Sequence, residues 1–461
     1  MALIGIASDE SGVTNARLID ELRETRARTL GLVDDLSEEQ LIGPRLQIVN
    51  PLRWEIGHVA WFQEFWVLRH LGGQPPILKT GDELYDSARV AHDTRWDLPL
   101  LERDKTLAYM QRVLERVIDQ AGDNSTGRTD AEGYDQEYFL NLVLLHEQMH
   151  DEAITYTRQT LSYPPPVIHE GVANKVRVAP QDAPLIQINN DLTRDAEIPG
   201  GKFILGSPPE QGFAFDNEQL AHELEIAPFA ISKTAASNGE FKHFVEDGGY
   251  RRSELWTVEG WQWRIAASAD CPVYWRRDGN DRWLRRSFDE WVTLDARLPV
   301  IHVNWHEVDA YCRWAGRRLP TEAEWEMAAS AEPDSKGRGL IEHKRRYPWS
   351  NDPPTRERAN LDWSAMGCVA VDALPAGDSA FGCRQMIGNV WEWTASDFKP
   401  YPGFIAGPYK EYSEPWFGDH KVLRGGCWVT RSRLIHNSYR NFYPPDRRDV
   451  WAGFRTCALP T

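Results

Sequence analysis

The sequence predicts an α+β protein of two domains, a four-helix bundle over residues 1–160 and a domain of short strands and turns over residues 191–461. Apolar side chains recur at helical spacing through the first part of the chain. The three prolines at 164–166 cannot continue a helix, so residues 161–190 are expected to form a crossover. Beyond it the chain is rich in Gly and Trp, and its 461 residues exceed what one core usually holds.

The first domain is expected to contain four helices. Their predicted ranges are 15–36, 51–71, 101–121 and 134–155. Asn50 is the expected N-cap of the second helix, with Pro51 at its first position and Gly72 just past its end. In the second domain, helical spacing predicts only two helices, over residues 305–315 and 321–330.

Composition argues against several classes of partner. The formal net charge of −17 disfavours a nucleic acid, because binding a phosphate backbone relies on a basic face. No apolar run approaches the length of a membrane span, and the N-terminus lacks a basic region before its short apolar stretch, so we expect a cytoplasmic protein without a membrane partner. The six cysteines are scattered without CxxC spacing, which predicts free thiols.

The last predicted helix of the bundle carries a pattern typical of metal ligands. In YDQEYFLNLVLLHEQMHDEAIT, His146 and His150 lie four residues apart, which places both imidazoles on one helix face. They follow an apolar run, which indicates that this face is buried. His58, between Gly57 and the nearby Ala60 of the second helix, is the expected third ligand, because inward-facing ligands are typical of bundle metal sites. Neutral imidazoles in this arrangement suit a divalent transition metal.

The same residues also spell His-Glu-x-x-His, the zinc motif of a class of metalloproteases. That interpretation requires Glu147 as the general base and a third ligand further along the chain, for which Glu170 is available.

Residues 81–100, GDELYDSARVAHDTRWDLPL, join the second and third helices without a strong helical period. A segment of this length in a compact domain is usually functional or disordered. Its mixture of charged and aromatic residues predicts a substrate arm, with Arg89 and Arg95 as candidate substrate ligands.

The second domain carries a series of characteristic phrases. They are IPGGKFILGS, FDNE, LPVIHVNWHEVDAYCRWAGRRLPTEAEWEMAA, GNVWEWTAS, VLRGGCW and WAGFRTC. In this order they resemble the formylglycine-generating-enzyme fold, an irregular domain related to C-type lectins. In many members of that family the GNVWEW segment and an upstream asparagine hold a structural Ca²⁺, so the resemblance implies Asn360, Asn389 and Glu392 as calcium ligands. The catalytic cysteine pair of that family is not evident, and Cys427 is expected in the core.

Joined to a DinB-like helical bundle with three histidines, this domain resembles the iron-dependent sulfoxide synthases of ergothioneine biosynthesis and their selenoneine-forming relatives. The resemblance implies Fe(II) on His58, His146 and His150, which removes the metalloprotease interpretation because the third ligand lies upstream. It also implies that Asn441 and Phe442 of the phrase RNFYPPDR hold hercynine, which is trimethylated histidine. Further candidates for substrate contacts are Tyr443, Arg447 and Trp428.

Two departures from the family concern the donor of sulfur or selenium. The actinobacterial ergothioneine enzymes have an arm rich in Arg-Pro and an Asp two residues after the pocket asparagine. Here the arm reads DSARVAHDTRWDLPL, Tyr443 stands at the Asp position, and Met149 stands where Gln is usual. These differences predict a selenosugar donor, hence a selenoneine synthase. The alternative is an ergothioneine sulfoxide synthase that uses cysteine or γ-glutamylcysteine.

The implied reaction uses O2 to join the donor to C2 of the hercynine imidazole, and it needs a proton or hydrogen-atom donor. Tyr409 and Tyr412 are the candidate catalytic residues, in a loop that also contains Tyr401. Aromatic side chains would suit the trimethylammonium group of hercynine. Two other classes stay open: a non-catalytic module that binds a metal or ligand, and a thiol-dependent metal hydrolase, in which the aromatic-rich second domain would have no role.

Overall fold

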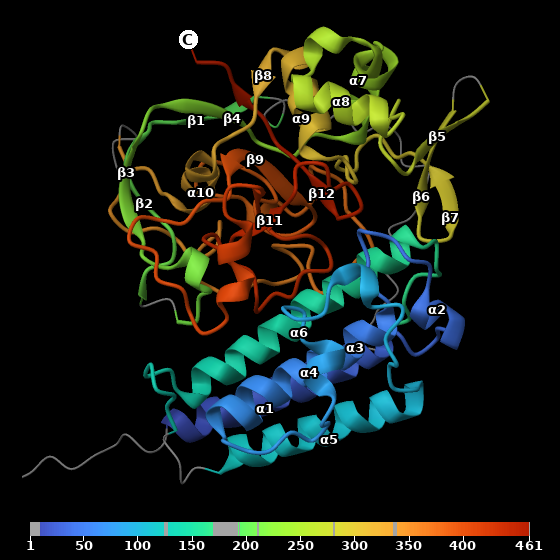
Figure 1. The fold of residues 1–461 in the computed structure, drawn as a ribbon. Coiled ribbons are helices and arrows are strands. Elements are labelled where there is room, and N and C mark those ends of the chain that lie inside the picture. Colours follow the sequence, from blue (N-terminus) through green and yellow to red (C-terminus); the bar gives the residue numbers. More distant parts are fainter. Residues whose placement is uncertain are drawn as a thin grey trace, which may run out of the picture. The chain divides into compact units, whose positions relative to one another are not determined.

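The computed structural model divides the chain into two compact units, Met1–Gly171 and Val172–Thr461 (Figure 1). The residues that the structure describes are 10–123, 128–168, 192, 194–209, 212–279, 282–334 and 339–460. Most of the predicted crossover at 161–190 lies outside these residues, so the predicted domain bounds stay a prediction. The predicted fold class is confirmed, because the first unit is a helical bundle and the second combines small sheets with short helices.

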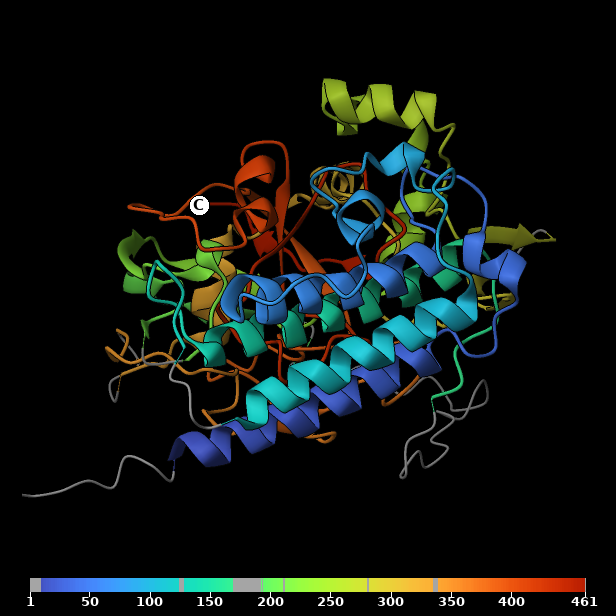
Figure 2. The ribbon, with the colours of Figure 1, turned by 60° about the horizontal axis from the view of Figure 1, so that its bottom comes forward.

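Four long helices form the first unit. They are α1 (Glu10–Gly31), α3 (Leu52–Gln63) with its π-helical continuation η1 (Glu64–Leu71), α5 (Arg103–Gly122) and α6 (Gln136–Thr160). Helices α1 and α3 each pack against both α5 and α6, and the four lie side by side in both views (Figures 1 and 2). Their apolar faces form the core, in which Leu22, Val113 and Leu142 are at most 1% exposed.

The start of the second long helix differs from the prediction. Helix α3 begins at Leu52 with Pro51 at the N-cap position, and no side chain caps it. The Asn50 side chain is instead turned toward the helix, and its amide donates to Oε1 of Glu55 at 2.5 Å. The end agrees with the prediction, because η1 stops at Leu71. The predicted N-cap was wrong because a carboxylate one turn into the helix binds the Asn50 amide.

Residues 81–100 are ordered against the second long helix rather than extended as an arm. They contain the short helices α4 (Gly81–Tyr85) and η2 (His92–Thr94). The indole N–H of Trp54 donates to the carbonyl oxygen of Leu84 at 2.7 Å, and Arg69 binds the Asp82 carboxylate through both of its terminal nitrogens. The segment is therefore part of the bundle's structure.

The second unit contains two four-stranded sheets, in the orders β1-β4-β13-β8 and β11-β10-β9-β12, and two smaller ones, β2-β3 and β5-β6-β7 (Figure 1). The strands of the first sheet are β1 (Asp195–Ile198), β4 (Phe229–Ser232), β8 (Arg317–Arg318) and β13 (Cys457–Ala458). Those of the second are β9 (Trp391–Asp397), β10 (Lys421–Arg424), β11 (Asn441–Tyr443) and β12 (Ala452–Gly453). The smaller sheets are formed by β2 (Gly201–Leu205), β3 (His222–Ile226), β5 (Trp275–Asp278), β6 (Arg282–Ser287) and β7 (Glu290–Thr293). Strand β11, which carries the predicted pocket residues, is an edge strand with Phe442 opposite Val422 of β10.

Both helices predicted for the second unit are present, as α9 (Trp305–Ala315) and α10 (Glu322–Ser330). Two further helices, α7 (Asn238–Glu246) and α8 (Val258–Ala266), were missed. Both are short and contain a glycine, Gly239 in α7 and Gly260 in α8, which disfavours a helix in a prediction from sequence. The capping box that begins at Ser237 is the signal that could have indicated α7.

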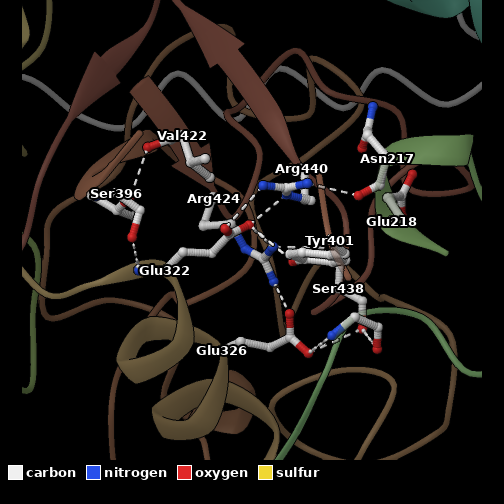
Figure 3. Close-up of polar contacts among 12 residues, drawn as sticks. Asn217, Glu218, Glu322, Glu326, Ser396, Tyr401, Val422, Arg424, Ser438 and Arg440 are labelled. Atoms are coloured by element: carbon white, nitrogen blue, oxygen red, sulfur yellow. Dashed lines mark hydrogen bonds and ion pairs between the residues drawn. The ribbon is translucent and has the colours of Figure 1, made fainter. Parts of the chain in front are cut away.

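A buried network of ion pairs joins α10 to the sheet that carries β11 (Figure 3). Arg440, the residue before β11, holds the Glu322 carboxylate through Nε at 2.7 Å and Nη2 at 3.1 Å. Arg424 of β10 contacts Glu322 at 3.0 Å and also binds Glu326, one turn further along α10. The side chains of Arg424, Arg440 and Glu326 are at most 1% exposed. Because each charge has a partner, the network fixes where β11 begins.

Glu218 is a buried acid beside this network without a comparable cation. Its Oε1 accepts from the backbone N–H of Phe215 at 3.2 Å, and its Oε2 lies 3.3 Å from Nε2 of His436. Burial raises the pKa of Glu218 to about 8, although Arg424 and Arg440 act in the opposite direction. Burial also lowers the pKa of His436 well below its ordinary value. The pair is therefore neutral at physiological pH.

Two further predictions from composition can be compared with the structure. No helix within the described residues is long and apolar enough to cross a membrane. All six cysteines are free thiols, and Cys427 is fully buried in the second unit, as predicted.

The neutral Glu218 predicts a pH-dependent stability. Its folded pKa lies above that of an exposed glutamate, so between about pH 4.5 and pH 8 the folded state binds more protons and stability falls as the pH rises. Glu218→Gln should remove this loss. Relative to the unmodified protein it should stabilise the second unit at pH 9, by about 1.4 kcal/mol for each unit of pKa difference, and change little at pH 4. Urea unfolding at several pH values measures this, with the exposed Glu225→Gln as control. An equal effect at all pH values would contradict it.

Candidate functional site

Three histidines meet in the interior of the first unit. His58 comes from α3, and His146 and His150 come from successive turns of α6. One ring nitrogen of each lies within 4.8 Å of the others, and the Nε2 atoms of His146 and His150 are 3.3 Å apart. His58 and His146 are each 2% exposed. The structure thus brings together the three ligands that the sequence predicted.

Hydrogen bonds at the opposite ring nitrogens determine which nitrogen could bind a metal. Nδ1 of His58 lies 2.7 Å from the carbonyl oxygen of Tyr85, and Nδ1 of His150 contacts the Glu55 carboxylate. Both partners can only accept, so Nδ1 carries the hydrogen in each ring and the lone pair is on Nε2. Sequence analysis did not single out either partner. Glu55 lies one turn before His58 on the same helix, and this spacing was the signal in the sequence that could have indicated a partner for a histidine.

Electrostatics also favour metal binding by these rings. Burial, with a smaller effect of His150, lowers the pKa of His58 to about 3, and burial lowers the pKa of His146 well below its ordinary value. Burial alone would raise the pKa of Glu55, but the adjacent His150 and Asn50 lower it to about 2. Neutral imidazoles beside an ionised carboxylate fit a divalent transition metal and need no deprotonation to bind it.

Aromatic rings hold the ligands in place. The ring of Phe62 stacks on His146 with centroids 3.5 Å apart, and Trp54 stacks on His58 at 4.6 Å. Position 57, next to His58, requires glycine, because a Cβ there would lie 2.3 Å from the ring of Tyr85. These contacts leave the imidazoles little rotational freedom, which favours a preorganised site.

The metalloprotease interpretation fails on the orientation of Glu147. Its carboxylate is fully buried and accepts hydrogen bonds from Arg26 at 2.7 Å, Thr29 at 2.8 Å and Gln63 at 2.7 Å. A carboxylate held by these groups is not available as a general base. Glu170, the third ligand in that interpretation, lies outside the described residues.

The predicted hercynine residues lie together on β11 in the second unit. The ring of Phe442 stacks on Phe398 with centroids 3.9 Å apart and lies 5.4 Å from the ring of Tyr412. The side-chain oxygen of Asn441 accepts from the backbone N–H of Phe442 at 2.8 Å, so its amide is held at the edge of the sheet. His420, which sequence analysis missed, faces Phe442 at 5.9 Å.

Of the two candidate catalytic tyrosines, Tyr412 has the more defined environment. Its hydroxyl lies 3.1 Å from that of Tyr439, and its ring lies 4.6 Å from Phe215. Burial raises the pKa of Tyr412 above its ordinary value. Tyr409 stacks beside it with centroids 6.0 Å apart. Tyr439 was not predicted, and no motif in the sequence indicated it.

Two of the other predicted substrate residues, Arg89 and Arg447, form ion pairs with nearby aspartates. Arg89 is exposed and pairs with Asp86 at 3.0 Å. Arg447 pairs with Asp449 at 2.7 Å, and its guanidinium lies over the ring of Tyr443.

Two of the predicted substrate residues are buried. Arg95 is 8% exposed and donates to Asn50 at 2.7 Å. Trp428 is fully buried beside Trp451, so we place it in the core of the second unit and no longer count it as a substrate contact.

The comparisons with known proteins agree with this arrangement. Residues 185–459 match the Sulfatase-modifying factor enzyme 1-like domain, and residues 21–154 match the DinB superfamily. A hercynine oxygenase of Mycobacterium tuberculosis is 35% identical over 443 residues, which cover 95% of this chain and 98% of that protein. One of Mycolicibacterium smegmatis is 34% identical over 453 residues, covering 96% and 99%.

The chain belongs to the hercynine oxygenase family. It is therefore an enzyme, an oxidoreductase, and the interpretations as a binding module or a hydrolase are set aside. A formylglycine-generating enzyme of Streptomyces coelicolor matches over only 57% of the chain, at 32% identity. The match to hercynine oxygenases includes the helical unit and its histidines, which is why it decides the family.

In this chain, the residues that the formylglycine-generating enzymes imply as calcium ligands are engaged with other protein groups. Both oxygens of Glu392 bind Arg455, at 2.6 and 2.7 Å. The side-chain oxygen of Asn389 accepts from Asn360 at 3.0 Å and from the backbone of Val369 at 2.8 Å. The buried Arg455 occupies the carboxylate that Ca²⁺ would need, so Ca²⁺ at this position stays a prediction without structural support.

We expect each of His58→Ala, His146→Ala and His150→Ala to abolish stable metal binding, because removing one nitrogen donor from a three-ligand site leaves too few protein ligands. Elemental analysis after anaerobic loading with Fe(II) and desalting measures this. His243→Ala is the control, since His243 is exposed on α7 and belongs to neither group of candidate metal ligands among the described residues, and it should retain the metal. A ligand variant that retains the full metal content would remove that residue from the site.

Proposed function

We propose that this chain is an iron- and O2-dependent enzyme that joins the sulfur of a thiol donor to C2 of the imidazole of hercynine and forms a sulfoxide. The observation that carries the proposal is the cluster of three histidines, two of them buried, in a chain related to hercynine oxygenases over 95% of its length. Neutral imidazoles also suit zinc, but a reaction with O2 requires a redox-active metal.

The overall reaction balances without an external reductant. The thiol S–H and the imidazole C2–H are lost and a C–S bond forms. One oxygen atom of O2 ends in the sulfoxide, and the other leaves as water with the two hydrogens. Bound iron would supply the one-electron chemistry with O2 that this carbon, a poor target for ionic substitution, requires.

The chain's own residues would bind and orient hercynine. Asn441 presents an amide at the edge of β11, suited to hydrogen-bond the carboxylate or imidazole of the substrate. Phe442 and the ring of Tyr412 beside it offer aromatic faces for the trimethylammonium group. Both residues belong to the second unit, so hercynine binding is expected to persist when the metal ligands are mutated.

Tyr412 is our candidate for the proton donor. A buried phenol with a raised pKa retains its proton at physiological pH, and Tyr439 holds the hydroxyl in one direction. Tyr409 lies beside it, with its ring centre 6.0 Å from that of Tyr412. We therefore assign the catalytic role to Tyr412 before Tyr409.

For the donor, the relatives favour sulfur. Proteins named hercynine oxygenase match this chain almost end to end, and none of the described contacts indicates a sugar site, so the selenosugar prediction has lost its support. The alternative of cysteine or γ-glutamylcysteine is adopted here. The exposed Arg89 offers a guanidinium for a donor carboxylate.

The test is a donor comparison with the full chain, Fe(II), hercynine and air. We expect O2 uptake only when hercynine and a thiol are both present, with a product whose mass equals their sum plus one oxygen and minus two hydrogens. Cysteine, γ-glutamylcysteine and a selenosugar are compared at equal concentration, and His146→Ala serves as the inactive control. Turnover with the selenosugar alone would overturn the thiol assignment. Turnover with no donor would overturn the proposed function.

Asn441→Ala should weaken hercynine binding by about tenfold or more, because an unpaired buried polar contact costs roughly 1–3 kcal/mol. Calorimetric titration of hercynine measures the affinity, and the metal content should be unchanged. The exposed Asn351→Ala is the control and should bind hercynine normally. Unchanged affinity in Asn441→Ala would remove Asn441 from the pocket.

A further inference from the structure

A chain of hydrogen bonds in the first unit runs from the 81–96 segment to a metal ligand. Nη1 of Arg95 donates to the side-chain oxygen of Asn50 at 2.7 Å, and the Asn50 amide donates to Oε1 of Glu55 at 2.5 Å. The other oxygen of Glu55 accepts from Nδ1 of His150. Arg95 is 8% exposed and Glu55 is 3% exposed, so water competes little with these contacts.

We propose that Arg95, Asn50 and Glu55 form a relay that positions His150 for the metal, and that Arg95 is a positioning residue of the metal site rather than a ligand of the substrate. The proposal depends on the three-histidine site of the proposed function. It goes beyond that function because it assigns a role to residues that touch neither the metal nor a substrate.

Each step of the relay has a fixed direction. Arginine can only donate, so the Asn50 side chain must present its oxygen to Arg95. Its amide then faces Glu55 and satisfies Oε1, which leaves Oε2 for His150. Because a carboxylate can only accept, His150 keeps its hydrogen on Nδ1 and its lone pair on Nε2. Without Arg95, the Asn50 amide could flip and this order would be lost.

A second branch reaches His58 from the same segment. The guanidinium of Arg95 lies 3.8 Å from the ring centre of Trp54, and Trp54 stacks on His58 with an angle of 10° between the rings. Near its other end the same segment contacts His58 directly, since the Tyr85 carbonyl accepts a hydrogen bond from Nδ1 of His58. Two of the three ligands are thus held by residues 81–96, whereas His146 is packed by Phe62 of α3.

Arg89 provides the contrast within the same segment. It is exposed, and it pairs with Asp86, three residues before it, at 3.0 Å. Sequence analysis assigned both arginines to the substrate because both are cationic in one polar segment. The two side chains differ in their burial and in the direction that they point. Arg95 is turned toward the helix that carries His58, and of the two only Arg89 is accessible to a ligand from solvent.

The experiment measures metal binding without any substrate. Full-chain variants Arg95→Met, Asn50→Asp and Glu55→Gln are compared with Arg89→Met for Co(II) affinity, by competition with a chelator, and for the ligand-field spectrum of bound Co(II). Loss of a partner behind a ligand typically lowers metal affinity by about 10–100-fold. We expect such a loss, with a changed spectrum, in the three relay variants and no change in Arg89→Met. Combining Arg95→Met with Glu55→Gln should weaken binding by less than the sum of the two single effects, because the two residues act on His150 through one path.

Unchanged Co(II) affinity and spectrum in Arg95→Met, together with a raised KM for the thiol donor, would overturn the proposal and make Arg95 a substrate ligand. If Arg95→Met does not fold by circular dichroism, Asn50→Asp decides, because it keeps the side-chain shape and reverses only the amide's donor. An unmodified protein that binds Co(II) through the three histidines but turns over no hercynine would contradict the proposed function and leave the relay standing.

Discussion

The hydrogen bonds behind the metal ligands are the constraint on which the first unit depends. An imidazole buried in a helical bundle can offer one nitrogen to a metal only if the other has an acceptor. For His58 that acceptor is the carbonyl of Tyr85, and for His150 it is Glu55. The first comes from the 81–96 segment, so this segment must be ordered for the site to exist. Its contacts with α3 and its short helix α4 follow from that requirement.

In the second unit, buried ion pairs hold the short elements together, whereas in the first unit long helices pack against one another. Arg440 and Arg424 bind α10 to the neighbouring strands β11 and β10, and Arg455 binds Glu392 of β9. Such pairs add little net stability, since desolvation offsets most of their attraction, but they specify one geometry. In a domain of short strands, that specificity sets where Asn441 and Phe442 lie.

A residue that departs from the family pattern can indicate a different donor only where its side chain is accessible to a substrate. The altered 81–100 segment led to a selenosugar prediction, on the assumption that its arginines face the substrate. In the structure Arg95 donates to Asn50 and lies over the ring of Trp54, so it faces the interior of the bundle. The predicted rebuilding of the donor side therefore rests on fewer residues than the sequence suggested, and the match to hercynine oxygenases carries more weight.

The fold class, the four bundle helices, the three histidines of the proposed metal site and the family were all accessible from the linear chain. They depend on local periodicity, on the four-residue spacing of His146 and His150, and on phrases of contiguous residues. Helices α7 and α8 were missed because each is short and contains a glycine, a residue that disfavours a helix. Glu55, Tyr85 and Tyr439 were missed for a different reason. Their roles arise from contacts between residues 20 to 100 positions apart, such as Glu55 with His150 and Tyr412 with Tyr439, and only packing decides which side chain fills a given direction. The same holds for Glu147. Its place in the His-Glu-x-x-His motif suggested a catalytic base, whereas in the structure its carboxylate accepts a hydrogen bond from Arg26.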